Sequence, residues 1–185
     1  MIVLGLVGEK GSGKQTFSDF LKDLAADKKI VHMRFSDILR ETLELWSLEL
    51  SRTNYQQLSI AMNKTFGKGT LSRALYNNVL KKEADIVILD GVRWLSDEEL
   101  LSSFPHKFMI YITADVEKRY QRVVKRKEKI GEGDATLEQF KAEEKVKTET
   151  LIPKIGKRAD IKIDNNGTLE DLKKLVNQLL HQHLI

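Results

Sequence analysis

The sequence contains no cysteine, no long apolar run and no block of charge of one sign. The lack of cysteine excludes disulfide bonds and thiolate-bound metal sites, and it fits a reducing compartment. No apolar run approaches the roughly 20 residues of a membrane-spanning helix, and the apolar start "MIVLGLV" is too short and lacks a basic leader. We therefore expect a soluble, cytoplasmic protein with no membrane partner.

The charges that are present are mixed along the chain. There are 31 Lys and Arg residues against 27 Asp and Glu residues, a net charge of +4, without the aromatic-containing basic stripe of a nucleic-acid binder. This mild surplus suits a small anionic ligand such as a nucleotide, or an ordinary solvated surface. A chain of 185 residues without internal repeats or linkers is most simply one domain. We expect a monomer or a small homo-oligomer.

Strand and helix signals alternate along the chain. Five apolar runs predict strands over residues 2–7, 30–35, 85–90, 107–113 and 160–164. Helical spacing predicts helices between them, including a long, mainly helical stretch over 36–83. Two capping boxes predict helix starts, one from Ser96 with Glu99 and one from Thr136 with Gln139, the latter opening a helix to about residue 152. This alternation predicts a parallel sheet covered on both faces, with its ligand beyond the carboxyl ends of the strands.

The segment "GEKGSGKQT" joins the first predicted strand to a predicted helix. Gly8, Gly13 and Lys14 satisfy the pattern G-x-x-x-x-G-K of a phosphate-binding loop, the Walker A motif. The glycines let backbone N–H groups surround phosphate oxygens, and the positive end of the helix dipole adds to this attraction. The pattern predicts that Lys14 reaches the β- and γ-phosphates. Gln15 stands where a serine or threonine usually holds magnesium.

With Gln15 followed by Thr16, the loop resembles that of the P-loop nucleoside monophosphate kinases, which include the adenylate kinases. Their loop commonly reads G-x-x-G-x-G-K-G-T, and magnesium is held there largely through water and nucleotide oxygens. The resemblance implies a three-layer α/β P-loop kinase fold with a five-stranded parallel sheet of order 2-3-1-4-5, and ATP and Mg²⁺ as cofactors. It assigns the ATP site to Gly8, Gly11, Ser12, Gly13, Lys14, Gln15 and Thr16, with Thr16 also beside the metal.

Two further segments resemble the acceptor site of that family. "SDILRE" resembles its D-x-L-R stretch, which implies that Arg40 binds the phosphate of the acceptor, with Asp37 beside it. "VILDGVRW" resembles its D-G-x-P-R strand end, which implies that Asp90 orients magnesium and Arg93 binds the acceptor phosphate. The proline is missing, as in an archaeal group of adenylate-kinase-like proteins whose strand ends D-G-x-R. The alternatives are that Arg40 pairs with Glu44 on a helix surface and that Asp37 caps the helix.

The segment "EKRYQRVVKRK" places Arg119, Arg122 and Arg126 on one helix face. The resemblance implies that Arg122 and Arg126 contact ATP and the migrating phosphoryl group, and a solvated basic face is the alternative. "IDNNGTLEDL" resembles the turn after the last strand, whose backbone contacts adenine in the family. This likeness assigns Asn166 to the ATP site.

The resemblance divides the single domain, residues 1–185, into a core, an acceptor-binding insert over about 36–83 and a short lid over about 127–148. Lids of the family usually supply arginine, whereas this segment offers Lys141, Lys145 and Lys147. Lysine lacks the bidentate fork of arginine and holds a phosphate less rigidly. An ordinary helix with a Glu143–Lys147 ion pair is the alternative for this segment.

The implied reaction is transfer of the γ-phosphoryl group of ATP to a (deoxy)nucleoside monophosphate, with Lys14, Arg93, Arg122 and Arg126 as catalytic residues. The acceptor base stays open, because the stretch over residues 52–69 also resembles the insert of phage-type deoxynucleotide kinases. One alternative is a kinase that acts on a hydroxyl group, such as a dephospho-coenzyme A kinase, with Asp37 as base. Another is a nucleotide-binding regulatory or ATPase module without an acceptor.

Overall fold

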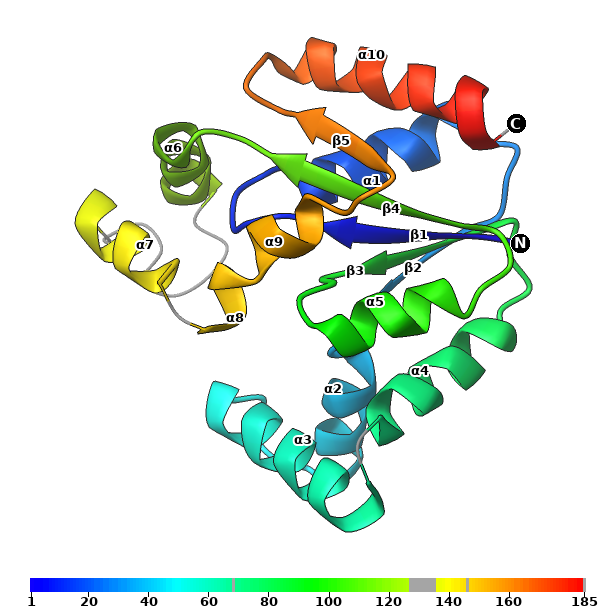
Figure 1. The fold of residues 1–185 in the computed structure, drawn as a ribbon, viewed down its shortest axis with the longest axis vertical. Helices are drawn as coiled ribbons and strands as arrows, with labels where there is room; N and C mark the ends of the chain where they lie inside the picture. The colour runs from blue at the N-terminus through cyan, green and yellow to red at the C-terminus, as the bar shows by residue number, and fades with distance from the viewer. Residues whose placement is uncertain (68, 127–135, 146, 185) are drawn as a thin grey trace.

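A five-stranded sheet, in which all neighbouring strands are parallel, forms the centre of the molecule (Figure 1). The structure is a computed structural model that describes residues 1–67, 69–126, 136–145 and 147–184. The strand order is β2-β3-β1-β4-β5, which confirms the order implied by the resemblance. The strands are β1 (Ile2–Val7), β2 (Ile30–Arg34), β3 (Ile86–Asp90), β4 (Lys107–Thr113) and β5 (Ile161–Asp164).

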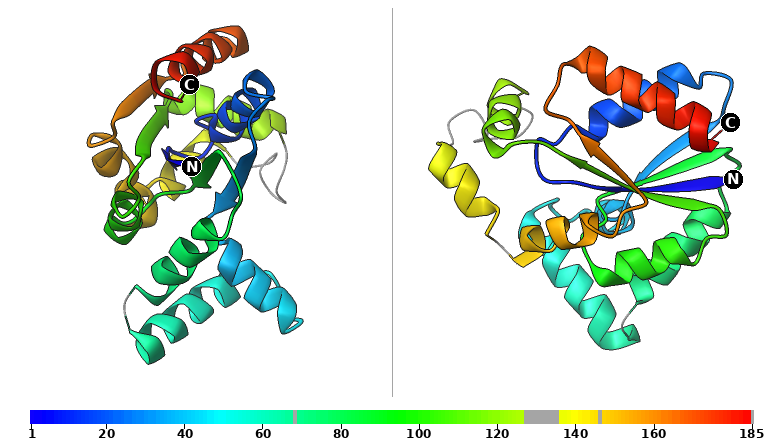
Figure 2. Two further views of the ribbon diagram at one scale, coloured as in Figure 1. Left: turned by 90° about the vertical axis from the view of Figure 1, so that its right-hand side faces the viewer. Right: turned by 45° about the horizontal axis from the view of Figure 1, so that its top comes forward.

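Helices cover both faces of the sheet, which makes three layers (Figure 2). One face packs against α1 (Lys14–Leu24), α10 (Leu169–Leu179) and the short π-helix η1 (Leu180–Leu184). The other face packs against α4 (Thr70–Leu80), α5 (Leu95–Ser102) and α9 (Ile152–Gly156). Side chains of β1 alternate between the two cores, with Leu4 and Leu6 on the first face and Val3 and Val7 on the second. Burial on both faces explains why β1 reads as an unbroken apolar run.

The segment after β2 forms three helices, of which α2 and α3 project away from the sheet (Figure 1). They are α2 (Asp37–Leu45), α3 (Arg52–Phe66) and α4, and together they form the long helical stretch that the sequence predicts. The Ser51 hydroxyl accepts a hydrogen bond from the backbone N–H of Asn54 and so caps α3. Leu75 and Val79 anchor α4 in the second core.

The capping box of Thr136 and Gln139 is confirmed at the start of α7 (Leu137–Glu143), because each residue receives the other's backbone N–H. The predicted box of Ser96 and Glu99 is wrong. At the start of α5 the Asp97 carboxylate instead accepts the backbone N–H groups of Arg93 and Trp94, at 2.9 and 3.0 Å. The helix begins at Leu95 rather than after Ser96, so Asp97 and not Glu99 occupies the third helical position, from which a carboxylate reaches back to the N-cap.

The prediction of a single charged helix from residue 136 to about 152 is also wrong. The segment instead contains α7 and α8 (Lys147–Thr150), and α9 begins at its end. Between β4 and α7 lies α6 (Val116–Arg126), the basic helix predicted from the arginine spacing. None of the described helices combines the length and the apolar character needed to cross a lipid bilayer.

Candidate functional site

The loop between β1 and α1 has the backbone shape that its glycines predict. Gly13 has φ +103°, in the left-handed region that L side chains rarely adopt, and its helix begins at Lys14. A Cβ atom at Gly13 would lie 2.3 Å from the Asn165 side-chain nitrogen, and one at Gly8 would lie 2.4 Å from the Ile112 carbonyl oxygen. Glycine at position 13 therefore meets both a conformational and a steric demand, and glycine at position 8 meets a steric demand.

A turn from the other end of the chain supports this loop. The side-chain amide of Asn165, buried after β5, donates to the backbone oxygen of Ser12 at 2.8 Å. The Arg122 guanidinium donates to the backbone oxygen of Asn165, also at 2.8 Å. The adjacent Asn166, for which an ATP contact is predicted, pairs with Asp115 at the β4–α6 connection. The role of Asn166 stays a prediction, whereas Asn165 is the residue that contacts the loop.

The Lys14 side chain folds back over its own loop. Its ammonium nitrogen donates to the backbone oxygens of Gly8 and Glu9, at 2.6 and 3.2 Å. These carbonyl groups hold the ammonium at the entrance of α1, where the loop pattern predicts contact with phosphate. The geometry fits the predicted role of Lys14, which remains to be tested.

Charged groups of both signs surround Lys14. Burial lowers the pKa of the Lys14 ammonium, and the nearby Arg93 charge acts in the same direction. The carboxylates of Asp90, Glu9 and Glu149 oppose this effect. Lys14 therefore lies within electrostatic range of three carboxylates and one guanidinium group.

Asp90 is the last residue of β3, so it lies at the same carboxyl edge of the sheet as Lys14. Burial acts to raise the pKa of Asp90, but contact with His32 and the charge of Lys14 outweigh it and hold the pKa below its ordinary value. The His32 Nε2 atom lies 3.7 Å from Asp90 Oδ2, which is longer than a hydrogen bond. Asp90 Oδ1 is buried and has no partner among the described residues. This carboxylate has a free oxygen of the kind that Mg²⁺ prefers.

Buried polar atoms without a hydrogen-bond partner gather around the loop. Buried polar groups are nearly always hydrogen-bonded, so such a group of exceptions is typical of a ligand site. Each atom belongs to the loop, to the carboxyl-end half of β2 or β3, or to α6. Among the described residues these atoms are Glu9 Oε2, Ser12 Oγ, His32 Nε2, Asp90 Oδ1 and Arg122 Nη1.

Glu9 is a functional candidate that the sequence reasoning missed. Although it belongs to the phosphate-binding loop, its side chain is buried, and its Oε1 accepts a hydrogen bond from the Tyr111 hydroxyl at 2.5 Å. Burial, together with this bond to Glu9, raises the pKa of Tyr111 to about 12. The only signal for Glu9 in the sequence is that it is an acidic residue within a loop whose other residues favour anion binding.

A polar cavity of about 510 Å³ opens beside α1. Basic side chains from α1, β2 and α2 outnumber the single carboxylate in its lining. The cavity brings together three of the predicted residues, Gln15, Asp37 and Arg40, with three that were not predicted. Its lining residues are Gln15, Lys22, His32, Arg34, Asp37 and Arg40.

Asp37 and Arg40 also make local contacts. Asp37 accepts the backbone N–H of Arg34 at 2.7 Å, and its other oxygen lies 3.5 Å from the Arg40 guanidinium. Arg40 also lies 3.5 Å from Glu44, as the alternative of a helix-surface pair predicts. Arg40 is half exposed, so both this local pairing and a ligand contact fit its position.

Arg93 follows β3 by three residues and points toward Glu149 of α8. Its Nη1 atom lies 2.5 Å from Glu149 Oε1, and its backbone N–H is fixed by Asp97. Burial raises the pKa of that Asp97 carboxyl to about 6, although its two backbone hydrogen bonds act in the opposite direction. The backbone N–H of Arg93 is thus bonded to Asp97 in α5, and its guanidinium is paired with Glu149 in α8.

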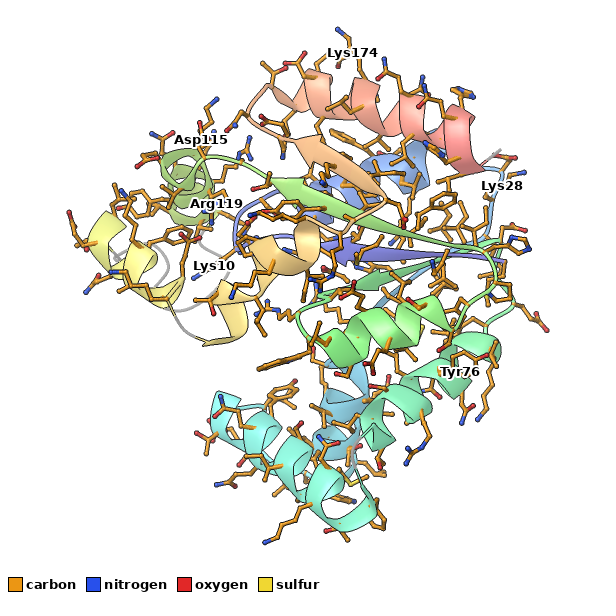
Figure 3. The ribbon with its side chains drawn as sticks, in the orientation of Figure 1. Lys10, Lys28, Tyr76, Asp115, Arg119 and Lys174 are labelled. Carbon is orange, nitrogen blue, oxygen red and sulfur yellow. The ribbon has the colours of Figure 1, made fainter. Side chains whose placement is uncertain are left out.

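The arginines of α6 differ in their surroundings. Arg119, which was not assigned a role, is buried and donates to the backbone oxygens of Ala114 and Lys10 (Figure 3). Arg122 is half buried, and burial lowers its pKa. Arg126 is exposed at the end of α6, beside residues outside the described part of the chain. The i, i+3 spacing that selected Arg122 was also the available signal for Arg119.

The predicted lid lies partly outside the described residues, which omit 127–135 and 146 and the side chain of Lys147. Of its lysines, Lys141 pairs with Glu117 of α6 at 3.0 Å, and Lys145 is exposed. The side chains that turn toward the loop are acidic. Glu143 pairs with Lys10 at 3.2 Å, and Glu144 pairs with Arg119.

A strand, a glycine-rich loop and a helix at the carboxyl edge of a parallel sheet define a P-loop nucleotide-binding protein of the kinase-like type. The chain belongs to the family whose model is described as AAA domain (AAA_17), which matches residues 7–141.

The similarity to other proteins and to solved structures covers nine-tenths of the chain or more. The chain is 26% identical to a UPF0200 protein of Methanosarcina mazei, over 100% of this chain and 96% of that one. It is 27% identical to a uridine kinase of Clostridium novyi, over 90% and 88%. Among solved structures, shikimate kinase from Bacteroides thetaiotaomicron has a TM-score of 0.62 at 11% identity, covering 97% and 98%. A gluconokinase from Sinorhizobium meliloti has a TM-score of 0.59 at 12% identity, covering 99% and 93%. The two structures establish the fold alone.

Proposed function

We propose that the protein is a nucleoside monophosphate kinase that transfers the γ-phosphoryl group of ATP to a (deoxy)nucleoside monophosphate. The observation that carries this proposal is the cavity beside α1, in which Arg34, Arg40, Lys22 and His32 oppose the single carboxylate of Asp37. A phosphate monoester carries about two negative charges, so a basic lining favours it over a neutral acceptor.

In this proposal the donor is held by the loop amides, by Lys14 and by Arg122 with its free buried nitrogen. Arg40 and Arg93 bind the acceptor phosphate, and Arg126 follows the transferring charge. Phosphoryl transfer asks the protein mainly for positioning and charge neutralisation, and an acceptor phosphate is already an anion. The reaction then needs no general base. Residues 36–83 serve as acceptor insert, and residues 127–148 as lid.

Magnesium belongs to this proposal, and the residues near the loop fit it. Asp90 offers a buried free oxygen at the end of β3, and Thr16 is the hydroxyl residue in the first turn of α1. The Gln15 amide instead donates to Asp19 along the helix surface, at 2.9 Å. Mg²⁺ commonly keeps several waters and binds through one or two carboxylates and substrate phosphates. A side-chain ligand at position 15 is therefore not required.

The experiment that tests the proposal measures KM for acceptor and for ATP in Arg40→Lys and Arg93→Lys, across a panel of ribo- and deoxynucleotide monophosphates. Each variant should lose about 2–4 kcal/mol of acceptor binding, because lysine cannot replace a bidentate fork. The KM for ATP should change little in Arg40→Lys. The matched control is Arg158→Lys, since Arg158 pairs with Glu98 in an exposed ion pair away from the loop. Its KM values should match wild type.

The second candidate is a kinase that phosphorylates a hydroxyl group. Asp37 lines the same cavity, where it could accept the proton of a hydroxyl acceptor, and similar chains include proteins named uridine kinase and shikimate kinase. Asp37→Asn decides between the two. If it abolishes turnover while the arginine variants bind acceptor normally, the acceptor is a hydroxyl. ATP consumption that needs no acceptor would instead indicate an ATPase module.

A further inference from the structure

Three carboxylates at the end of the predicted lid region and just after it contact cationic groups around the loop. Glu143 is the last residue of α7, Glu144 follows it directly, and Glu149 belongs to α8. We call these three residues the acidic strap. Their partners, at 3.2 Å for the first pair and 2.5 Å for the last, are Lys10, Arg119 and Arg93 respectively.

The partners of the strap lie where a polyphosphate would lie. Lys10 is part of the phosphate-binding loop, and Arg119 donates to its backbone oxygen at 3.4 Å (Figure 3). The Arg93–Glu149 ion pair lies near Lys14, the lysine of the same loop. Glu149 is about four-fifths buried, at 22% side-chain exposure. Its carboxylate therefore lies beside the two cations that the proposed transfer would use.

A carboxylate and a phosphate bind arginine through the same bidentate geometry, so they compete for one guanidinium group. The carboxylates of Glu9, Asp90 and Glu149 all lie near Lys14, together with the guanidinium of Arg93. A bound polyphosphate would add several negative charges to this group. Glu9 is part of the loop and Asp90 ends a central strand, whereas Glu149 belongs to a four-residue helix outside the sheet. Glu149 is the carboxylate that can leave at the smallest structural cost.

We infer that the acidic strap is an autoinhibitory contact in which Glu143, Glu144 and Glu149 take the place of substrate phosphates, and that binding of a polyphosphate displaces them. The inference rests on the proposed function only in taking a polyphosphate nucleotide as the ligand. The strap keeps the arginines in place before substrate arrives. It also selects for ligands with enough phosphate groups to replace several carboxylates at once.

The test uses the full chain and isothermal titration calorimetry, with ATP and with inorganic tripolyphosphate as probes. Glu144→Gln and Glu149→Gln should each bind both probes about fivefold more tightly than wild type, the low end of typical coupling between sites. The double variant should bind more tightly still. The matched control is Glu138→Gln, an exposed residue in the first turn of α7, whose affinity should stay at the wild-type value.

A second measurement separates competition from a general gain in stability. Without ligand, the strap variants should melt at or below the wild-type temperature because they lose ion pairs, while the ligand-induced rise in Tm should increase. Equal or weaker affinity in both strap variants would overturn the inference, as would an equal gain in Glu138→Gln. Neither probe requires turnover. Tighter binding without transfer to any nucleotide would reject the kinase proposal alone, and normal transfer with unchanged affinity would reject the strap alone.

Discussion

The phosphate-binding loop and the acidic strap meet at Lys10, but different forces hold them. The loop is fixed by buried backbone contacts, such as the bond from Asn165 to Ser12, and by glycines that leave no room for a side chain. The strap is held by side-chain ion pairs, of which the Lys10–Glu143 pair is largely exposed. Buried backbone geometry cannot be exchanged for a ligand, whereas an ion pair can. The loop is therefore preformed, whereas the acidic strap is a contact that a ligand can replace.

The largest expected effect is a loss of turnover that leaves the folding of the loop unchanged. Lys14→Ala should reduce turnover by about 10²-fold or more, because the charge that neutralises the transferring phosphate is lost. Thermal unfolding without ligand should stay close to wild type, since burial already disfavours the charged ammonium. Steady-state kinetics measure the turnover, and a thermal melt measures the stability. Turnover within a few-fold of wild type would remove Lys14 from the proposed mechanism.

The next effect concerns the fold of the loop itself. Gly13→Ala forces a side chain into a left-handed conformation and against Asn165, and should cost about 1–3 kcal/mol in the free energy of unfolding or more. Gly67→Ala is the matched control, because Gly67 also has positive φ but a Cβ there meets nothing within 4 Å. Urea denaturation of both variants measures the difference. If the two costs were equal, the contact with Asn165 would contribute nothing to the shape of the loop.

The effect that is smallest near neutral pH is a pH dependence of stability at Asp97, which binds the backbone of Arg93. Burial raises the pKa of Asp97 to about 6 from an ordinary value of 3.8, so the folded protein binds a proton there more tightly than the unfolded chain. Stability from this group is present below about pH 4 and is lost as the pH rises through about 6, by about 3 kcal/mol at most. In Asp97→Asn this loss should be absent. The difference in the free energy of unfolding between wild type and variant should therefore change across pH 4–6 and stay constant above pH 7. A constant difference throughout would show that Asp97 is not perturbed.

The strands and the loop could be predicted because their signals are local. An apolar run bounded by polar residues needs no knowledge of its neighbours, and the spacing of Gly8, Gly13 and Lys14 has one main structural use. The sheet order came from the resemblance and is confirmed. The error at Ser96 and Glu99 has a local cause, since the helix begins at Leu95 and places Asp97 at the third helical position.

The remaining parts of the site depend on contacts between distant segments. Asn165 and Asn166 are equivalent as turn residues, and only the assembled sheet shows which of them meets Ser12. Glutamates on a charged helix have the same pattern whether they face water or Arg119. Glu9 was overlooked because its partner, Tyr111, is 102 residues away.

The bond between Ser12 and Asn165 joins residues 153 positions apart. During synthesis the loop emerges early, but the residue that supports it emerges long after four of the five strands have been made. Contacts of such long separation form late, after the cost of closing the chain has been met by other interactions. A growing chain therefore acquires the finished loop only when β5 joins the edge of the sheet, so a nucleotide that binds the finished loop cannot guide the earlier steps of folding.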